Sequence, residues 1–119
     1  MHDHEETLRK LAIRDDKLVD AILAGGRESE ASSLDTRTMA LVRIAALIAI
    51  DAGPPSYMNP IESALEAGAT ADEIVDTLEA VMPAIGVARV VSAAPKLGLA
   101  LGYDVSSALE ELRAEKSTG

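Results

Sequence analysis

Two arginines in this chain lie where a lone cation could bind a small acid. Arg43 is part of the apolar stretch MALVRIAALIAI, and Arg89 is part of the apolar stretch GVARVV. A buried guanidinium must pair with a carboxylate or reach water, because burying it alone is costly. Either arginine could hold a substrate carboxylate through two parallel hydrogen bonds. The commoner alternative is a structural ion pair, within the chain or across a subunit interface, with Glu62, Asp51 or Glu79.

Three further residues could move a proton or attack a substrate. Glu62 would serve as a general acid or base if burial raised its pKa toward neutrality, but its place in the helical pattern favours a solvated face. Tyr57 could donate a proton or orient a ligand, whereas most buried tyrosines only satisfy their own hydroxyl groups. Ser56 has no histidine base nearby in the sequence, which argues against a serine nucleophile.

The sequence contains no cysteine and only two histidines, His2 and His4. The absence of cysteine excludes disulfides, thiolate metal sites and thiol catalysis. His2-Asp3-His4 resembles a fragment of a metal site, but a terminal triplet without further ligands is a weak signal. We therefore expect no metal and no other cofactor.

The composition favours one all-α domain over residues 1–119, with frayed ends at 1–4 and 117–119. A chain of 119 residues has the usual length of a single domain, and 48% of these residues are hydrophobic. Phe and Trp are absent, so Ala, Leu, Ile and Val must fill the core. These small aliphatic side chains let helices approach one another closely, and alanine has the highest helix propensity.

Charge and hydropathy exclude several kinds of partner. The net charge of −9 argues against nucleic acid, because phosphate binding needs a basic face. The longest apolar run, residues 44–50, is too short to span a bilayer, and the charged N-terminus does not have the pattern of a signal peptide. We therefore expect a soluble cytoplasmic protein that binds neither nucleic acid nor membranes.

Start and stop signals divide the chain into about six helices. We expect an amphipathic helix over residues 5–24, ended by a pair of glycines. An almost wholly apolar helix should follow over 36–52, where Gly-Pro-Pro ends it. Such a helix is buried on most sides, either in the monomer or between subunits. A short helix over 57–67 comes next, with Gly68 as its C′ residue.

Thr70 and Glu73 form the pattern of a capping box, which predicts a helix over 71–81. Pro83 and Gly86 then mark a kink or break in the chain.

The remaining sequence predicts an apolar segment over 87–101 and a last helix that reaches about residue 116. Pro95 should kink the apolar segment or divide it. Ala94, Gly98 and Gly102 recur at intervals of four and would let another backbone approach closely. Asp104 is a good N-cap for the last helix.

From 34 to 102 the sequence resembles the carboxymuconolactone decarboxylase and alkylhydroperoxidase D superfamily. The residues that carry the resemblance are LDTRTMALVRIAALIAI and IESALEAGATADEIVDTL. The resemblance implies an alkylhydroperoxidase D-like helical bundle that assembles as a homo-oligomer, often a trimer or hexamer. The nearly all-apolar helix over 36–52 favours such assembly independently.

The resemblance also implies that the catalytic residues of the family have been replaced in this chain. Aligning the peroxidase branch on IESALEAGAT places its two cysteines at Gly53 and Ser56, its histidine at Pro60 and its glutamate near Leu41. None of these side chains can cycle between dithiol and disulfide or relay a proton. The decarboxylase branch typically keeps the histidine at the position of Pro60, so its acid–base residue is missing as well.

The residues leave two hypotheses open. The first is a cofactor-independent enzyme related to the lactone decarboxylases, in which Arg43 or Arg89 anchors a small carboxylated metabolite and Glu62 or Tyr57 moves the proton. The second is a catalytically silent, oligomeric module that binds a small anionic ligand or a partner protein. An open pocket lined by one of the arginines would favour the first, and a pocket packed shut would favour the second.

Overall fold

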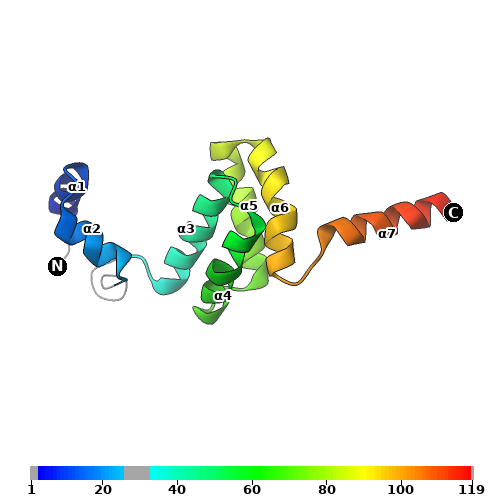
Figure 1. Ribbon diagram of the computed structural model, residues 1–119, viewed down its shortest axis with the longest axis horizontal. Coiled ribbons are helices and arrows are strands. Elements are labelled where there is room, and N and C mark those ends of the chain that lie inside the picture. The colour runs from blue at the N-terminus through cyan, green and yellow to red at the C-terminus, as the bar shows by residue number, and fades with distance from the viewer. Residues whose placement is uncertain (1–2, 26–32, 119) are drawn as a thin grey trace. The chain divides into compact units, whose positions relative to one another are not determined.

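A computed structural model describes residues 3–25 and 33–118 of the chain. All regular secondary structure in these residues is helical (Figure 1). These residues form seven α-helices and one short 3-10 helix, η1, compared with the six or so helices expected. The prediction of an all-α fold is confirmed. Of the ends expected to fray, residues 1, 2 and 119 lie outside the described residues. The chain divides into two compact units, Met1–Thr36 and Arg37–Gly119, and each is described by itself.

The first unit has two helices, α1 (His4–Ala12) and α2 (Asp16–Leu23), so the prediction of one helix over 5–24 is wrong. The chain turns at Arg14, whose φ is 53°. Asp15 then caps α2 by accepting a hydrogen bond from the backbone N–H of Leu18 at 3.1 Å. An aspartate side chain competes with the helical backbone for hydrogen bonds, so it starts a new helix here despite the amphipathic pattern.

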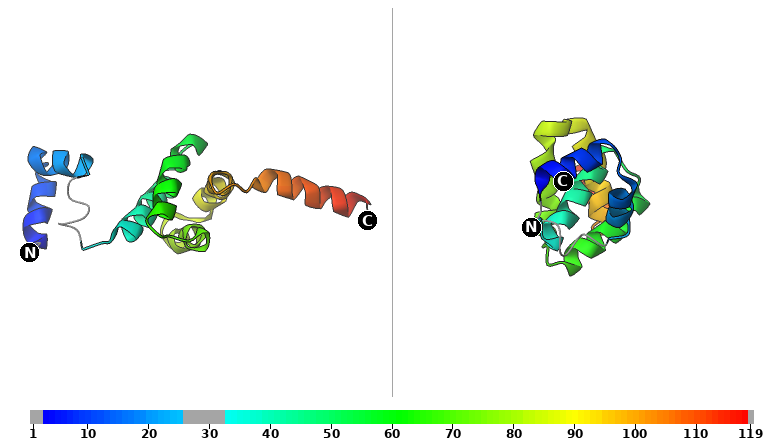
Figure 2. Two further views of the ribbon diagram at one scale, coloured as in Figure 1. Left: turned by 90° about the horizontal axis from the view of Figure 1, so that it is seen from below. Right: turned by 90° about the vertical axis from the view of Figure 1, so that its left-hand side faces the viewer.

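The second unit contains the remaining elements, which follow one another along the chain. These are α3 (Thr36–Ala49, which starts at the unit boundary), η1 (Pro54–Tyr57), α4 (Met58–Glu66), α5 (Ala71–Ile85), α6 (Val87–Ala100) and α7 (Val105–Thr118). The most extensive contact joins α5 to α6, and α6 also contacts η1 and α7 (Figure 2). Helix α6 therefore packs against three other elements of this unit.

The core of this unit consists of small and aliphatic side chains, as the composition predicted, together with one tyrosine. Its buried residues are Ala40, Ile44, Ile48, Tyr57, Ile61, Ala64, Ala69, Ile74, Leu78, Val90, Ala93 and Leu97. On α3 the buried positions recur every fourth residue, so only one stripe of this apolar helix faces the core. Its other side remains exposed in the single chain.

The junction between α4 and α5 has the stop signal that the sequence predicts. Gly68 has φ 97°, a left-handed conformation that suits glycine. Its N–H donates to the carbonyl of Leu65 at 3.1 Å, and the N–H of Ala69 donates to the carbonyl of Ala64 at 2.9 Å. These two bonds make a Schellman motif, which satisfies the carbonyls at the end of α4.

The capping box at the start of α5 is also confirmed. The N–H of Glu73 donates to Thr70 Oγ1 at 3.0 Å, and the N–H of Thr70 donates to Glu73 Oε1 at 2.9 Å. The same carboxylate accepts hydrogen bonds from Arg37, which joins the first turn of α3 to the cap of α5.

Prolines alter the helices less than the sequence predicts. Helix α5 continues through Pro83 to Ile85, and the break comes at Gly86, whose φ is 90°. Pro95 lies within α6 and does not divide it. Because Pro83 stands near the end of α5, the N–H group it lacks removes a hydrogen bond only from the last turn.

The link from α6 to α7 depends on Gly98, where the predicted close approach occurs. A Cβ atom on Gly98 would lie 3.0 Å from Val105 Cγ2 and 3.1 Å from the carbonyl oxygen of Tyr103. Gly102 has φ 90° and ends α6, and Asp104 caps α7 by accepting from the N–H of Ser107 at 3.1 Å. The close approach is made by the same chain, immediately after α6.

Candidate functional site

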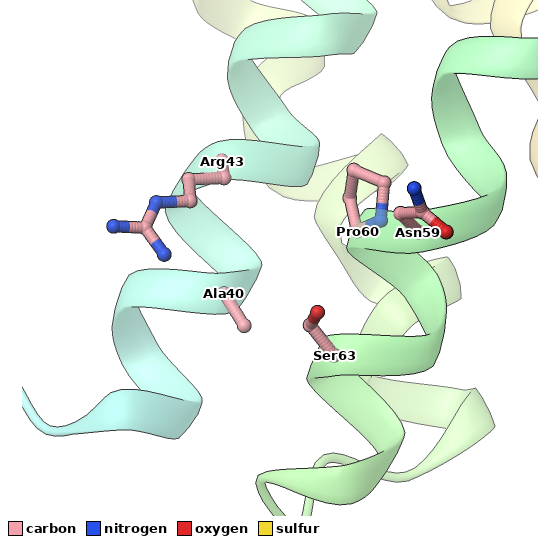
Figure 3. Close-up of a pocket in the computed structure, with 5 residues that line it drawn as sticks. All are labelled: Ala40, Arg43, Asn59, Pro60 and Ser63. Carbon is pink, nitrogen blue, oxygen red and sulfur yellow. The ribbon is translucent and has the colours of Figure 1, made fainter. Parts of the chain in front are cut away.

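A small pocket lies between α3 and α4. It is lined by Ala40 and Arg43 from α3 and by Asn59, Pro60 and Ser63 from α4, with a volume of about 200 Å³ (Figure 3). Drug-sized ligands usually occupy pockets of roughly 300–1,000 Å³, so this one suits a smaller molecule. Of the five residues that the sequence offered for a site, which are Arg43, Arg89, Glu62, Tyr57 and Ser56, only Arg43 lines it.

Local sequence explains how these side chains reach one pocket. Ala40 and Arg43 are three residues apart, as are Pro60 and Ser63, so each pair lies on one face of its helix. Pro60 stands in the first turn of α4, where its missing N–H removes no hydrogen bond from the helix. At the position that the resemblance assigns to the family histidine, the pocket is therefore lined by the ring of Pro60, which cannot transfer a proton.

The polar groups of the pocket point in different directions. The hydroxyl of Ser63 points into the space between α3 and α4 (Figure 3). The guanidinium of Arg43 extends from α3 to the side away from α4, and Arg43 is exposed (Figure 3). The amide of Asn59 is turned away from Ser63. A ligand held by both helices would thus need the long Arg43 side chain to turn toward α4.

Arg89 lies elsewhere and has the structural ion pair that was the commoner expectation. Its Nη1 is 3.5 Å from Asp51 Oδ2. The Oδ1 atom of the same aspartate accepts hydrogen bonds from Ser92 Oγ at 2.7 Å and from Lys96 Nζ at 3.1 Å. Lys96 also donates to the carbonyl of Ala52 at 3.2 Å, so the group joins the end of α3 to one face of α6.

Asp51 is the centre of this group, whereas from the sequence it was expected only as one of three possible partners for an arginine. The hydroxyl of Ser92 and then the ammonium of Lys96 lower its pKa below the usual range. Its φ of 55° is uncommon for an aspartate and turns the chain just after α3. The spacing of Arg89, Ser92 and Lys96 predicts that they share one face of a helix, but it does not identify Asp51 as the carboxylate that they meet.

Tyr57 is fully buried, and its hydroxyl has no hydrogen-bond partner among the described residues. Burial raises the pKa of Tyr57, and the negative charge of Asp51 adds to the increase. The phenol is therefore kept neutral, but it does not line the pocket. Glu62 is on the exposed side of α4 and does not line the pocket either. Neither of the two candidates for proton transfer is brought to Arg43.

The first unit has a hollow of its own, and the described residues contain no metal-binding cluster. The hollow is formed by residues of α1 and of the turn to α2, has a volume of about 520 Å³ and mixes acidic, basic and apolar side chains. No group of three or more His, Asp or Glu side chains in the described part of the chain could hold a metal ion. His4 begins α1, and His2 lies outside the described residues. No described helix has the length and apolarity needed to cross a membrane.

Comparison with known proteins gives one match. The model of the carboxymuconolactone decarboxylase family matches residues 16–97, which extend from α2 to within α6 and include the pocket, Asp51 and Tyr57. No curated protein and no solved structure matches the chain. Helix α7 lies beyond the matched residues.

Proposed function

Because this chain belongs to the carboxymuconolactone decarboxylase family, we propose that it is a self-associating protein that binds a small carboxylate at Arg43 without transforming it. The observation that carries the proposal is the lining of the pocket between α3 and α4. It offers a guanidinium, an amide and a hydroxyl, which are hydrogen-bond donors, and no group that titrates near neutral pH.

The chemistry of these donors suits a carboxylate. A guanidinium can donate two parallel hydrogen bonds to the two oxygens, and the hydroxyl of Ser63 can donate a third from the facing helix. The Arg43 side chain has enough rotatable bonds to turn toward Ser63 when an anion enters. With about 200 Å³ available, the ligand would be a short acid of a few carbon atoms.

The position of the other candidate residues supports binding without catalysis. Arg89 is engaged with Asp51, Glu62 is exposed outside the pocket, and the hydroxyl of Tyr57 is enclosed in the core. A general acid or base must come within hydrogen-bonding distance of its substrate. The absence of cysteine from the whole sequence excludes the thiol peroxidase reaction independently.

Self-association is supported by the large aliphatic side chains that the second unit exposes. Five such residues are more than half exposed: Val42 on α3, Ile50 directly after α3, and Val87, Val91 and Leu99 on α6. Exposed apolar patches of this kind mark interaction surfaces in soluble proteins. We expect a closed symmetric oligomer, a trimer or a hexamer, because most soluble oligomers have closed symmetry.

An NMR titration of the ¹⁵N-labelled protein with succinate and benzoate tests the proposal. We expect saturable shifts at the amides of Ala40 and Ser63. Arg43→Ala should weaken binding by about 10- to 100-fold, since hydrogen bonds to charged groups contribute about 1.5–3 kcal/mol. Arg14→Ala, which removes the same charge from the first unit, is the matched control and should bind normally. Equal binding by both variants would refute the site.

A second candidate is a cofactor-independent decarboxylase or lyase acting on such an acid. One observation favours it: Tyr57 is kept protonated and directly precedes α4, which lines the pocket. Carbon dioxide release from a carboxylated muconolactone, measured for the wild type and for Tyr57→Phe, separates the candidates. Turnover that is lost in Tyr57→Phe but kept in Tyr103→Phe would support the enzyme, whereas binding without turnover supports our proposal.

A further inference from the structure

The pocket between α3 and α4 has a polar mouth and an apolar floor. The mouth is formed by its three polar lining residues, Arg43, Asn59 and Ser63, which are all exposed. The floor is formed by its two apolar lining residues, which are more enclosed: Ala40 is only 6% exposed and Pro60 is partly buried. A small molecule that enters the pocket therefore meets hydrogen-bond donors at the surface and carbon atoms deeper in.

The floor is continuous with the hydrophobic core. Ala40 belongs to the buried stripe of α3 that continues with Ile44, and its Cβ points toward α4 (Figure 3). Pro60 is followed in α4 by the buried Ile61, and its ring has no N–H to donate. Apart from Tyr57, which does not line the pocket, no described residue with a polar or charged side chain is buried. A charged group that reached the floor would thus find no side-chain donor there.

We propose that this pocket selects short aliphatic monocarboxylates over dicarboxylates, an inference that rests on the carboxylate binding proposed above. The carboxylate would lie at the mouth, and the hydrocarbon chain would lie against Ala40 and Pro60. Each CH₂ group that moves from water into an apolar contact tightens binding by up to about fourfold. A second carboxylate in the same place would lose its water without gaining a partner, which is unfavourable.

Arg43 supplies the charge at the mouth but does not distinguish one short acid from another. It already takes part in an interaction in the ligand-free chain, so any anion must compete with that partner, whatever the rest of the ligand is. A guanidinium also donates to any accessible carboxylate in the same way. Discrimination among acids therefore depends on what each of them places against the floor.

The volume of the pocket limits the length of the hydrocarbon chain. About 200 Å³ is available. A water molecule takes up roughly 30 Å³ of liquid, so the pocket has room for about six atoms of that size. Butyrate is an acid of this size, and its methyl end would reach the floor. Ala40 sets the limit, because a larger side chain at its position would fill the space that the end of the chain occupies.

NMR titrations of the ¹⁵N-labelled wild type with acetate, propionate, butyrate and succinate test this inference at one pH and one ionic strength. From the shifts of the Ala40 and Ser63 amides we expect the Kd to fall by up to about fourfold with each carbon added from acetate to butyrate. Succinate carries a carboxylate in place of the terminal methyl group of butyrate. It should therefore bind at least about tenfold more weakly than butyrate.

The variant Ala40→Val tests the floor directly, because it adds two methyl groups where the end of the chain would lie. Butyrate should bind to it at least about fourfold more weakly than to the wild type, whereas the Kd of acetate, which does not reach the floor, should change by less than about twofold. Ala46→Val makes the same substitution at an exposed position of α3 and is the matched control, with both acids bound as by the wild type. If Ala40→Val does not fold, the wild-type series still decides the inference.

The outcomes separate this inference from the proposed function. If all four acids bind with the same Kd, or if succinate binds as tightly as butyrate, the floor does not select the ligand, and only carboxylate binding at Arg43 stands. Equal loss of butyrate binding in Ala40→Val and Ala46→Val would also overturn the inference. If no acid shifts the two amides, or if butan-1-ol binds as tightly as butyrate, both the inference and the proposed function are wrong, because the carboxylate would contribute nothing.

Discussion

The hydroxyl of Tyr57 should destabilise the folded protein, and replacing Tyr57 with phenylalanine should raise stability. The ring fills the core, but the hydroxyl is buried without a hydrogen-bond partner among the described residues. Leaving a buried polar group unsatisfied costs about 1–3 kcal/mol, whereas phenylalanine keeps the ring and removes that cost. We therefore expect the free energy of unfolding to increase by about 1 kcal/mol or more.

Thermal and urea unfolding monitored by circular dichroism measure this change. For a chain of this size, 1 kcal/mol corresponds to an increase in Tm of about 4 °C. The control is Tyr103→Phe, because Tyr103 is the second tyrosine of the sequence and is exposed. Its replacement should leave Tm unchanged to within about 1 °C, as surface substitutions usually do.

The pH dependence gives a second measure of the same environment. Burial and the charge of Asp51 raise the pKa of Tyr57 in the folded state above its ordinary value of 10.0. Below pH 10 both states are protonated, so the residue adds no pH dependence. As the pH rises above 10, the unfolded state loses its proton first and the wild type loses stability, until the pH reaches the folded pKa. The stability gap to Tyr57→Phe should therefore widen above pH 10.

Either of two results would refute this reasoning. If Tyr57→Phe lowers the free energy of unfolding by about 1 kcal/mol, the hydroxyl makes a net favourable hydrogen bond in the folded protein. An unchanged gap between the two proteins above pH 10 would show that the phenol is not buried.

Three further predictions concern the second unit. Asp51→Asn should make the free energy of unfolding depend less on pH in the acid range. The pKa of Asp51 is lowered in the folded state, so its contribution to stability is present above its unfolded pKa and is lost as the pH falls through its folded pKa. An unchanged pH dependence of the free energy of unfolding, measured by urea titrations from pH 2 to 6, would contradict this. Thr70→Ala should cost about 1 kcal/mol in urea unfolding because it removes the capping hydroxyl of α5, whereas Thr70→Ser should restore most of it. Gly98→Ala should fail to give the roughly 1 kcal/mol that alanine usually adds within a helix, because its Cβ would crowd Tyr103 and Val105; a full gain in Tm would mean that α7 is not held against α6.

Features encoded by neighbouring residues could be predicted from the sequence. The glycine at 68, the capping box of Thr70 and Glu73 and the cap at Asp104 each depend on a few adjacent side chains and backbone groups, and each is present. The amphipathic pattern over 5–24 failed because hydrophobic periodicity continues through a turn. Only the local competition of Asp15 for a backbone N–H decides that two helices form.

Features that depend on packing could be predicted only in part. The sequence identified Arg43 and Arg89 as similar cations, and their different surroundings follow from the tertiary structure. Asp51 reaches Arg89 because the end of α3 meets one face of α6, which no local pattern reveals. Whether a tyrosine hydroxyl in the core finds a partner is likewise decided by packing, so the state of Tyr57 could not be inferred from its neighbours in sequence.

The carboxylate of Glu73 couples the detachment of α3 to the fraying of the first turn of α5. One of its oxygens accepts from both the Thr70 N–H and Arg37, and the other accepts from Arg37 alone. If α3 moves away, Glu73 loses the hydrogen bonds from Arg37 that orient its carboxylate toward the cap. If the first turn of α5 frays, Arg37 loses its hydrogen-bond partner. Exchange of the Thr70 amide hydrogen with solvent therefore reports on the attachment of α3, which lies more than thirty residues earlier in the chain.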